Sequence, residues 1–183
     1  FVKCTLALVF AACGGEVPEQ PQEQSNAGTA AFVASAGQGE GAAARFVDVA
    51  EQVGIDFVHT SGRSGRKYGV ETIGSGVVFF DYDSDGWIDL YAVNGADLPG
   101  YTSAEKPLNA LYRNDGGRFT DVTVSAAVGD TSWSMGTAVA DYDNDGHVDL
   151  YVSNYGRNTL YRNLGDGRFE DVTAAAGVGH EGW

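Results

Sequence analysis

The stretch that decides the fold is Asp81-Tyr-Asp-Ser-Asp-Gly-Trp-Ile-Asp-Leu-Tyr91, which recurs 60 residues later as Asp141-Tyr-Asp-Asn-Asp-Gly-His-Val-Asp-Leu-Tyr151. Each copy has aspartate at loop positions 1, 3, 5 and 9 and glycine at position 6. This spacing directs several hard oxygen atoms to one centre, because glycine permits the sharp bend. Two carboxylates about 4 Å apart repel by about 4 kcal/mol at an effective dielectric constant near 20. The stretch therefore predicts two cation-binding loops. The alternative is an aspartate-rich turn whose side chains bond their own backbone.

Calcium is the expected cation, because it accepts 6–8 oxygen ligands in flexible geometry. Each loop would supply four carboxylates and the backbone carbonyl of position 7. The expected ligands are Asp81, Asp83, Asp85, Trp87 (carbonyl) and Asp89 in the first loop, and Asp141, Asp143, Asp145, His147 (carbonyl) and Asp149 in the second. The loops resemble the first nine positions of an EF-hand. However, Ala92 and Val152 stand where that motif requires glutamate.

The segments on either side of each loop indicate β-strands. Residues 75–80 and 88–93 are short and rich in β-branched and aromatic side chains, and 137–140 and 148–152 repeat them. Each loop is therefore expected to be the turn of a hairpin.

The repeat extends beyond the loops. Asn109–Thr123 matches Asn158–Thr173, and each reads as strand, Asn/Gly turn and strand. Arg45–Val49 copies the last strand and predicts an opening strand. Four short strands in a unit of about 50 residues are typical of a β-propeller blade, and propellers close with about 4 to 8 blades. We therefore expect an all-β partial propeller over residues 45–183, with two four-stranded blades plus the opening strand, as an N-terminal fragment of a longer protein.

These repeats resemble FG-GAP/VCBS repeats, the calcium-binding propeller blades also seen in integrin α-subunits. The strings Gly69–Gly76 and Asn158–Asn163, with the Phe-x-Asp-Val-Thr elements, are similar to secreted bacterial relatives of cartilage acidic protein. Those relatives often end in an ASPIC/UnbV domain. The resemblance implies a propeller fold and bound calcium, and it indicates no particular ligand or activity.

The N-terminus predicts export. Residues 1–13 form an apolar run behind Lys3, too short to span a bilayer but typical of a secretion signal. Cys13 follows two alanines and resembles the lipidation site of a bacterial lipoprotein. We expect an extracytoplasmic protein, either a cell-envelope or outer-membrane lipoprotein or a secreted one. An ordinary cleaved signal and a chance apolar start are the alternatives.

Residues 14–44 are rich in Pro, Glu, Gln, Ala, Gly and Ser and have few large apolar side chains. This composition predicts a flexible tether, with a leader of no mechanical use as the alternative.

The net charge of the chain limits the function classes to be expected. A net charge of −14 argues against nucleic-acid partners, whose phosphates would be repelled. We expect a non-enzymatic, calcium-binding module that binds protein or glycan at the cell surface and contacts membrane only through a lipid anchor. One alternative is a propeller-scaffold hydrolase or lyase that uses His59 and Tyr68. The other is a structural spacer for a C-terminal domain.

Overall fold

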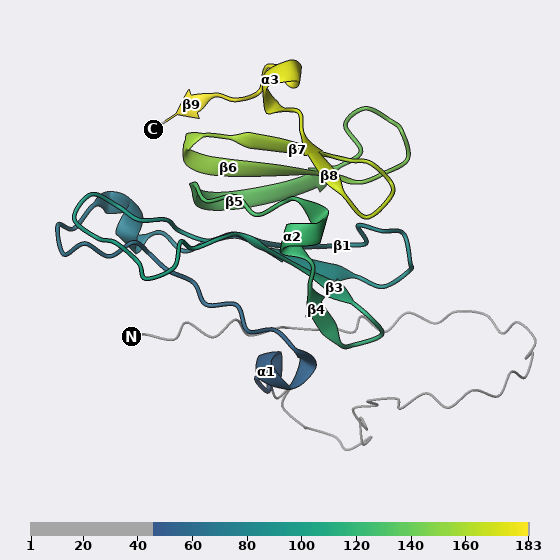
Figure 1. The fold of residues 1–183 in the computed structure, drawn as a ribbon, viewed down its shortest axis with the longest axis horizontal. Helices are drawn as coiled ribbons and strands as arrows, with labels where there is room; N and C mark the ends of the chain where they lie inside the picture. Colours follow the sequence, from purple (N-terminus) through teal and green to yellow (C-terminus); the bar gives the residue numbers. More distant parts are fainter. Residues whose placement is uncertain (1–45, 183) are drawn as a thin grey trace, which may run out of the picture.

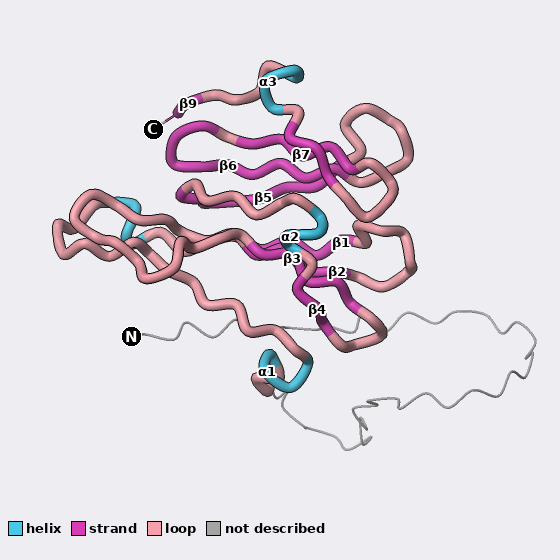
Figure 2. The backbone as a smooth tube through the Cα atoms, in the orientation of Figure 1, coloured by secondary structure: helices cyan, strands magenta, loops and turns pink. Residues whose placement is uncertain are grey.

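The computed structural model describes residues 46–182, which form two layers of antiparallel sheet stacked on one another (Figures 1 and 2). The expected signal (1–13), with Cys13, and the tether (14–44) lie outside the described residues. Within the described range, none of the helices has the length and apolar character that crossing a membrane requires.

The first sheet has the order β1-β2-β3-β4. Its strands are β1 (Val77–Phe80), β2 (Asp89–Ala92), β3 (Ala110–Asn114) and β4 (Phe119–Asp121). Phe80 pairs with Asp89 at the end of the first hairpin, so the acidic loop is the turn between β1 and β2. This arrangement confirms the predicted hairpin.

The second sheet repeats the first, with the order β5-β6-β7-β8. Its strands are β5 (Trp133–Ala140), β6 (Asp149–Arg157), β7 (Thr159–Asn163) and β8 (Phe169–Asp171). A short strand, β9 (Glu181–Gly182), pairs with the end of β6. Ala140 pairs with Asp149, which places the second acidic loop between β5 and β6. The described residues are thus mostly β, as expected, and form two open sheets that do not close on themselves.

A one-turn helix follows each Phe-x-Asp-Val element, a feature that the sequence analysis missed. The helices are α1 (Ala50–Val53), α2 (Thr123–Ala126) and α3 (Thr173–Ala176), and the insertion before β1 adds a 3-10 turn, η1 (Gly69–Thr72). In each case the aspartate of the element accepts a hydrogen bond from the first backbone N–H of the helix, at 3.1, 2.9 and 2.9 Å. The aspartate therefore redirects the chain from strand into helix.

The predicted opening strand at Arg45–Val49 was wrong. Residues 46–49 have no strand structure, and Arg45 lies outside the described residues. The two later copies, β4 and β8, are strands because β3 and β7 pair with them. Residues 46–49 pair with no strand in the described range, so their backbone groups join no ladder.

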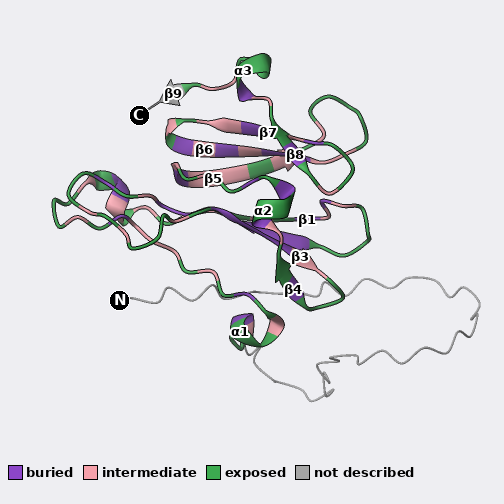
Figure 3. Cartoon of the chain, viewed as in Figure 1, coloured by how far each residue is buried: buried purple, intermediate pink, exposed green. Residues whose placement is uncertain are grey.

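The main core lies between the two sheets (Figure 3). It is formed by side chains of both layers, among them Tyr91 and Leu111 from the first and Leu150 and Val152 from the second, all fully buried. A smaller core covers the far face of the first sheet, where α1 and Ile55 pack against β2, β3 and β4.

Repeat-related residues differ in exposure. Tyr82, which follows β1, is 5% exposed because its ring packs on Phe169 of the second sheet, with the centroids 6.1 Å apart. Its counterpart Tyr142 is 44% exposed. Ala126 is likewise fully buried, whereas its counterpart Ala176 is exposed. At these two positions the second repeat is therefore exposed, where the first repeat is part of the core.

Candidate metal centres

The same hydrogen bonds build both acidic loops. The carboxylate of Asp81 accepts the N–H of Asp85 at 3.1 Å and that of Gly86 at 3.0 Å. Asp141 makes the equivalent bonds at 3.1 and 3.0 Å. Gly86 has φ of 89° and its counterpart 91°, a left-handed backbone that glycine adopts without steric cost. The position-1 aspartate thus closes a turn that the position-6 glycine permits.

The aspartate at position 9 ties each loop to the third strand of its sheet. Asp89 is fully buried and accepts the N–H of Tyr82 at 2.9 Å and that of Asn114, on β3, at 2.8 Å. Asp149 makes the two equivalent bonds at 3.0 and 2.8 Å. The geometry of each loop is therefore fixed by the sheet beneath it.

Three carboxylates converge in each loop, those at positions 1, 3 and 9. Their oxygen atoms lie within 4.8 Å of one another in two groups: Asp81, Asp83 and Asp89, and Asp141, Asp143 and Asp149. The structure thus brings together six of the eight predicted carboxylates. Asp85 and Asp145 lie outside these groups and hydrogen-bond to the N–H of position 7 through one oxygen. That they bind the ion, with the carbonyls of position 7, stays a prediction.

The charge of the first group has little compensation inside the protein. Burial raises the pKa of Asp89 to about 6, against the effect of its two backbone donors. Burial and the nearby charge of Asp85 also raise the pKa of Asp83. One oxygen of Asp83, Oδ1, is buried and accepts no hydrogen bond from the described residues. A converging, all-oxygen donor set with an unpaired buried oxygen suits a hard cation such as calcium.

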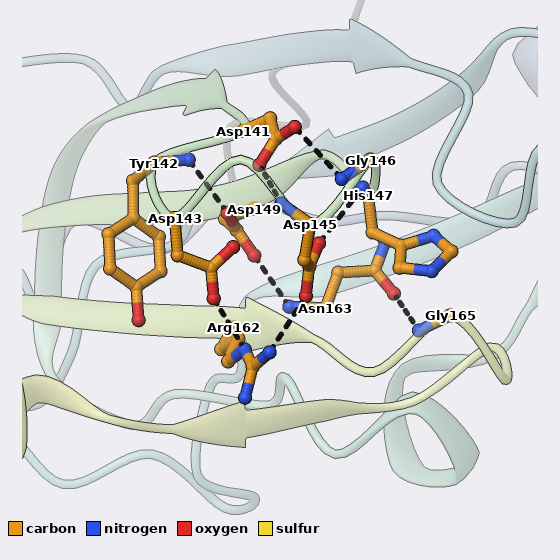
Figure 4. A network of polar contacts seen from close by, with 10 residues as sticks. All are labelled: Asp141, Tyr142, Asp143, Asp145, Gly146, His147, Asp149, Arg162, Asn163 and Gly165. Atoms are coloured by element: carbon orange, nitrogen blue, oxygen red, sulfur yellow. Dashed lines mark hydrogen bonds and ion pairs between the residues drawn. The ribbon is translucent and has the colours of Figure 1, made fainter.

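An arginine lies over the second loop, and the sequence analysis missed it. Arg162, on β7, places Nε 2.7 Å from Oδ2 of Asp143 and Nη2 2.8 Å from Oδ2 of Asp145 (Figure 4). Its hydrogen bond holds the pKa of Asp145 below the usual range. The Leu-Tyr-Arg-Asn string that carries Arg162 recurs around Arg113 and Asn114. That recurrence was the available signal for both the arginine and the asparagine.

The two residues considered for an enzyme, His59 and Tyr68, have different polar surroundings. Burial lowers the pKa of His59, and its Nε2 has no hydrogen-bond partner in the described part of the chain. The hydroxyl of Tyr68 donates to the carbonyl of Pro99 at 3.4 Å. No hydrogen bond joins His59 to Tyr68 within residues 46–182.

Comparison with known proteins identifies the repeat. A family model described as FG-GAP-like repeat matches residues 81–152 and again 141–183, and each match begins at the first aspartate of an acidic loop. Together the two matches cover 81–183, more than half of the 183 residues. A search of curated proteins finds no match. The narrower resemblance to ASPIC/UnbV-associated proteins stays a prediction. The chain therefore belongs to the FG-GAP-like repeat family.

Proposed function

We propose that this chain is a calcium-stabilised, β-propeller-like module that binds a protein or glycan outside the cytoplasm. The observation that supports it most is the repeated convergence of three carboxylates, at the same positions of each FG-GAP-like repeat. Each group lies in the turn of a hairpin, and its position-9 aspartate also bonds to the third strand. An ion bound there would hold three strands of one sheet together.

Calcium fits these loops better than magnesium does. Magnesium demands near-ideal octahedral geometry and gives up its water reluctantly, whereas calcium accepts irregular sets of oxygen ligands. Asp81 and Asp89 already use both oxygens as hydrogen-bond acceptors, so their positions are set by the backbone and not by an ideal octahedron. Bound calcium would supply positive charge for the converging carboxylates and take no part in catalysis.

The exposure of two residues of the second repeat, Tyr142 and Ala176, supports a propeller-like arrangement. The second sheet covers Tyr82 and Ala126 of the first repeat. The equivalent residues of the second repeat, Tyr142 and Ala176, are exposed. A further repeat of the same kind would cover them in the same way. Repetition of such units places their loops side by side, which provides the surface for a ligand.

An extracytoplasmic location agrees with this role. Extracellular calcium modules bind with dissociation constants of about 10⁻⁴–10⁻³ M. We place the protein at the cell envelope, attached through lipid on Cys13, or free after secretion. This part of the proposal rests on the sequence of residues 1–13 alone.

Thermal and urea denaturation of the full chain in EGTA, calcium and magnesium tests the metal assignment. With a dissociation constant near 10⁻⁴ M, 1 mM calcium should stabilise the fold by about 1.4 kcal/mol per site. Magnesium should stabilise it much less. The matched control is the variant Asp83→Ala/Asp143→Ala, which should lose the calcium response. Stability that is the same in EGTA and in calcium would reject calcium binding. A glycan array probed in calcium and in EGTA then tests the binding role.

A further inference from the structure

The two metal loops differ in their arginine. In the second loop Arg162 contacts Asp143 and Asp145, with its side chain 38% exposed. In the first repeat the equivalent Arg113 makes no ion pair with its loop and pairs instead with Asp115, at 3.1 Å from Nε to Oδ1. The first acidic loop (81–89, loop 1) therefore has no ion pair with an arginine within the described residues. In the second (141–149, loop 2) the guanidinium of Arg162 contacts two of the carboxylates.

The residue that follows the recurring asparagine explains this difference. That residue is Asp115 in the first repeat and Leu164 in the second, and its N–H donates to the carbonyl of Arg118 or Arg168, respectively. The two residues therefore open the same turn in each repeat, although the turn of the second repeat is one residue longer. Leu164 has no side-chain acceptor, so Arg162 finds its carboxylates in the metal loop.

We propose that Arg162 is an internal counter-cation of the second loop, and that it makes the second loop the weaker calcium site. Asp143 belongs to the converging group of loop 2, and its Oδ2 is already engaged at 2.7 Å. Calcium must share or displace the guanidinium there, but meets no such competitor at Asp83. We expect the dissociation constant of loop 2 to be about tenfold higher, the equivalent of about 1.4 kcal/mol. This inference rests on the proposed calcium binding.

A reciprocal exchange in the two turns tests it. Leu164→Asp offers Arg162 the partner that Arg113 already has, and should tighten calcium binding at loop 2. Asp115→Leu removes that partner and should weaken binding at loop 1. Leu164 is 44% exposed and Asp115 is also exposed, so both exchanges should be tolerated. Calorimetric titration of the full chain measures each loop, with the other silenced by Asp83→Ala or Asp143→Ala.

A new aspartate at position 164 would attract calcium by its own charge. A double-mutant cycle separates this effect on calcium affinity from the effect of moving Arg162. Arg162→Gln alone should tighten loop 2 about tenfold. Leu164→Asp should then add little in the Arg162→Gln background. Melting in EGTA confirms that each variant is folded.

The outcomes are distinguishable. Calcium binding at neither loop would reject the proposed function, and the inference with it. Two sites of equal affinity that do not respond to the exchanges would reject the inference and leave calcium binding intact. Weaker binding in Arg162→Gln would also overturn it, since the arginine would then support the site. A tighter loop 2 in Arg162→Gln, together with the opposite effects of the two exchanges, would establish it.

Discussion

Replacing Asn163 with alanine should show how much a hydrogen bond between the two repeats contributes to the free energy of unfolding. Asn163 is fully buried at the end of β7. Its Nδ2 donates to the carbonyl of Tyr82, in the acidic loop that follows β1, at 2.7 Å and to that of Val148 at 3.1 Å. Its Oδ1 accepts the N–H of Gly165 at 3.0 Å. Alanine removes all three bonds.

The equivalent Asn114 provides a matched control. It bonds to the carbonyl of Ile88 at 2.9 Å and to the N–H of Gly117, both within its own repeat, and it is only half-buried. Water can replace these bonds in Asn114→Ala, so the expected loss is about 1 kcal/mol. Asn163→Ala leaves the buried Tyr82 carbonyl without a partner, and a buried orphan costs about 1–3 kcal/mol more. We therefore expect a loss of about 2–4 kcal/mol.

Urea denaturation of both variants, followed by circular dichroism in EGTA, measures the difference. The use of EGTA removes any contribution of calcium to the comparison. Equal losses in the two variants would refute the reasoning, because the bond between the two repeats would then contribute nothing.

Three further predictions follow from single residues. Ala127 ends α2 at φ of 61°, where the other repeat has Gly177 at 68°, so Ala127→Gly should raise the free energy of unfolding by about 0.5–1 kcal/mol and Gly177→Ala should lower it. Urea titrations measure the free energy of unfolding of both variants. A lower value in Ala127→Gly would contradict backbone strain at Ala127. Because burial raises the pKa of Asp89 from 3.8 to about 6, the metal-free fold binds this proton more tightly than the unfolded chain does. The free energy of unfolding of the metal-free fold should therefore fall by on the order of 3 kcal/mol as the pH is raised from about 4 to about 6. A free energy of unfolding that rises over this window in EGTA would contradict the raised pKa of Asp89. Cys13→Ser should move the exported protein from the detergent phase to the aqueous phase, and wild type found in the aqueous phase would mean no lipid.

The sequence by itself determined the acidic loop of each repeat and the strands on either side of it. The aspartates at positions 1 and 5 and the glycine at position 6 bond within the loop, so this part of the turn needs no distant partner. The flanking strands were also predictable, since residues 75–80 and 88–93 contain β1 and β2. Position 9 was identified as a carboxylate of the loop, and the structure places it there.

Only the tertiary structure decided what equivalent residues do in different surroundings. Tyr82 is buried and Tyr142 exposed because a second sheet covers only the first. Arg162 contacts a metal loop and Arg113 does not, because the neighbouring side chain differs. Residues 46–49 match β4 in sequence and yet form no strand, because a strand exists only where another pairs with it. Packing and pairing depend on the neighbour in space, which a local motif does not specify.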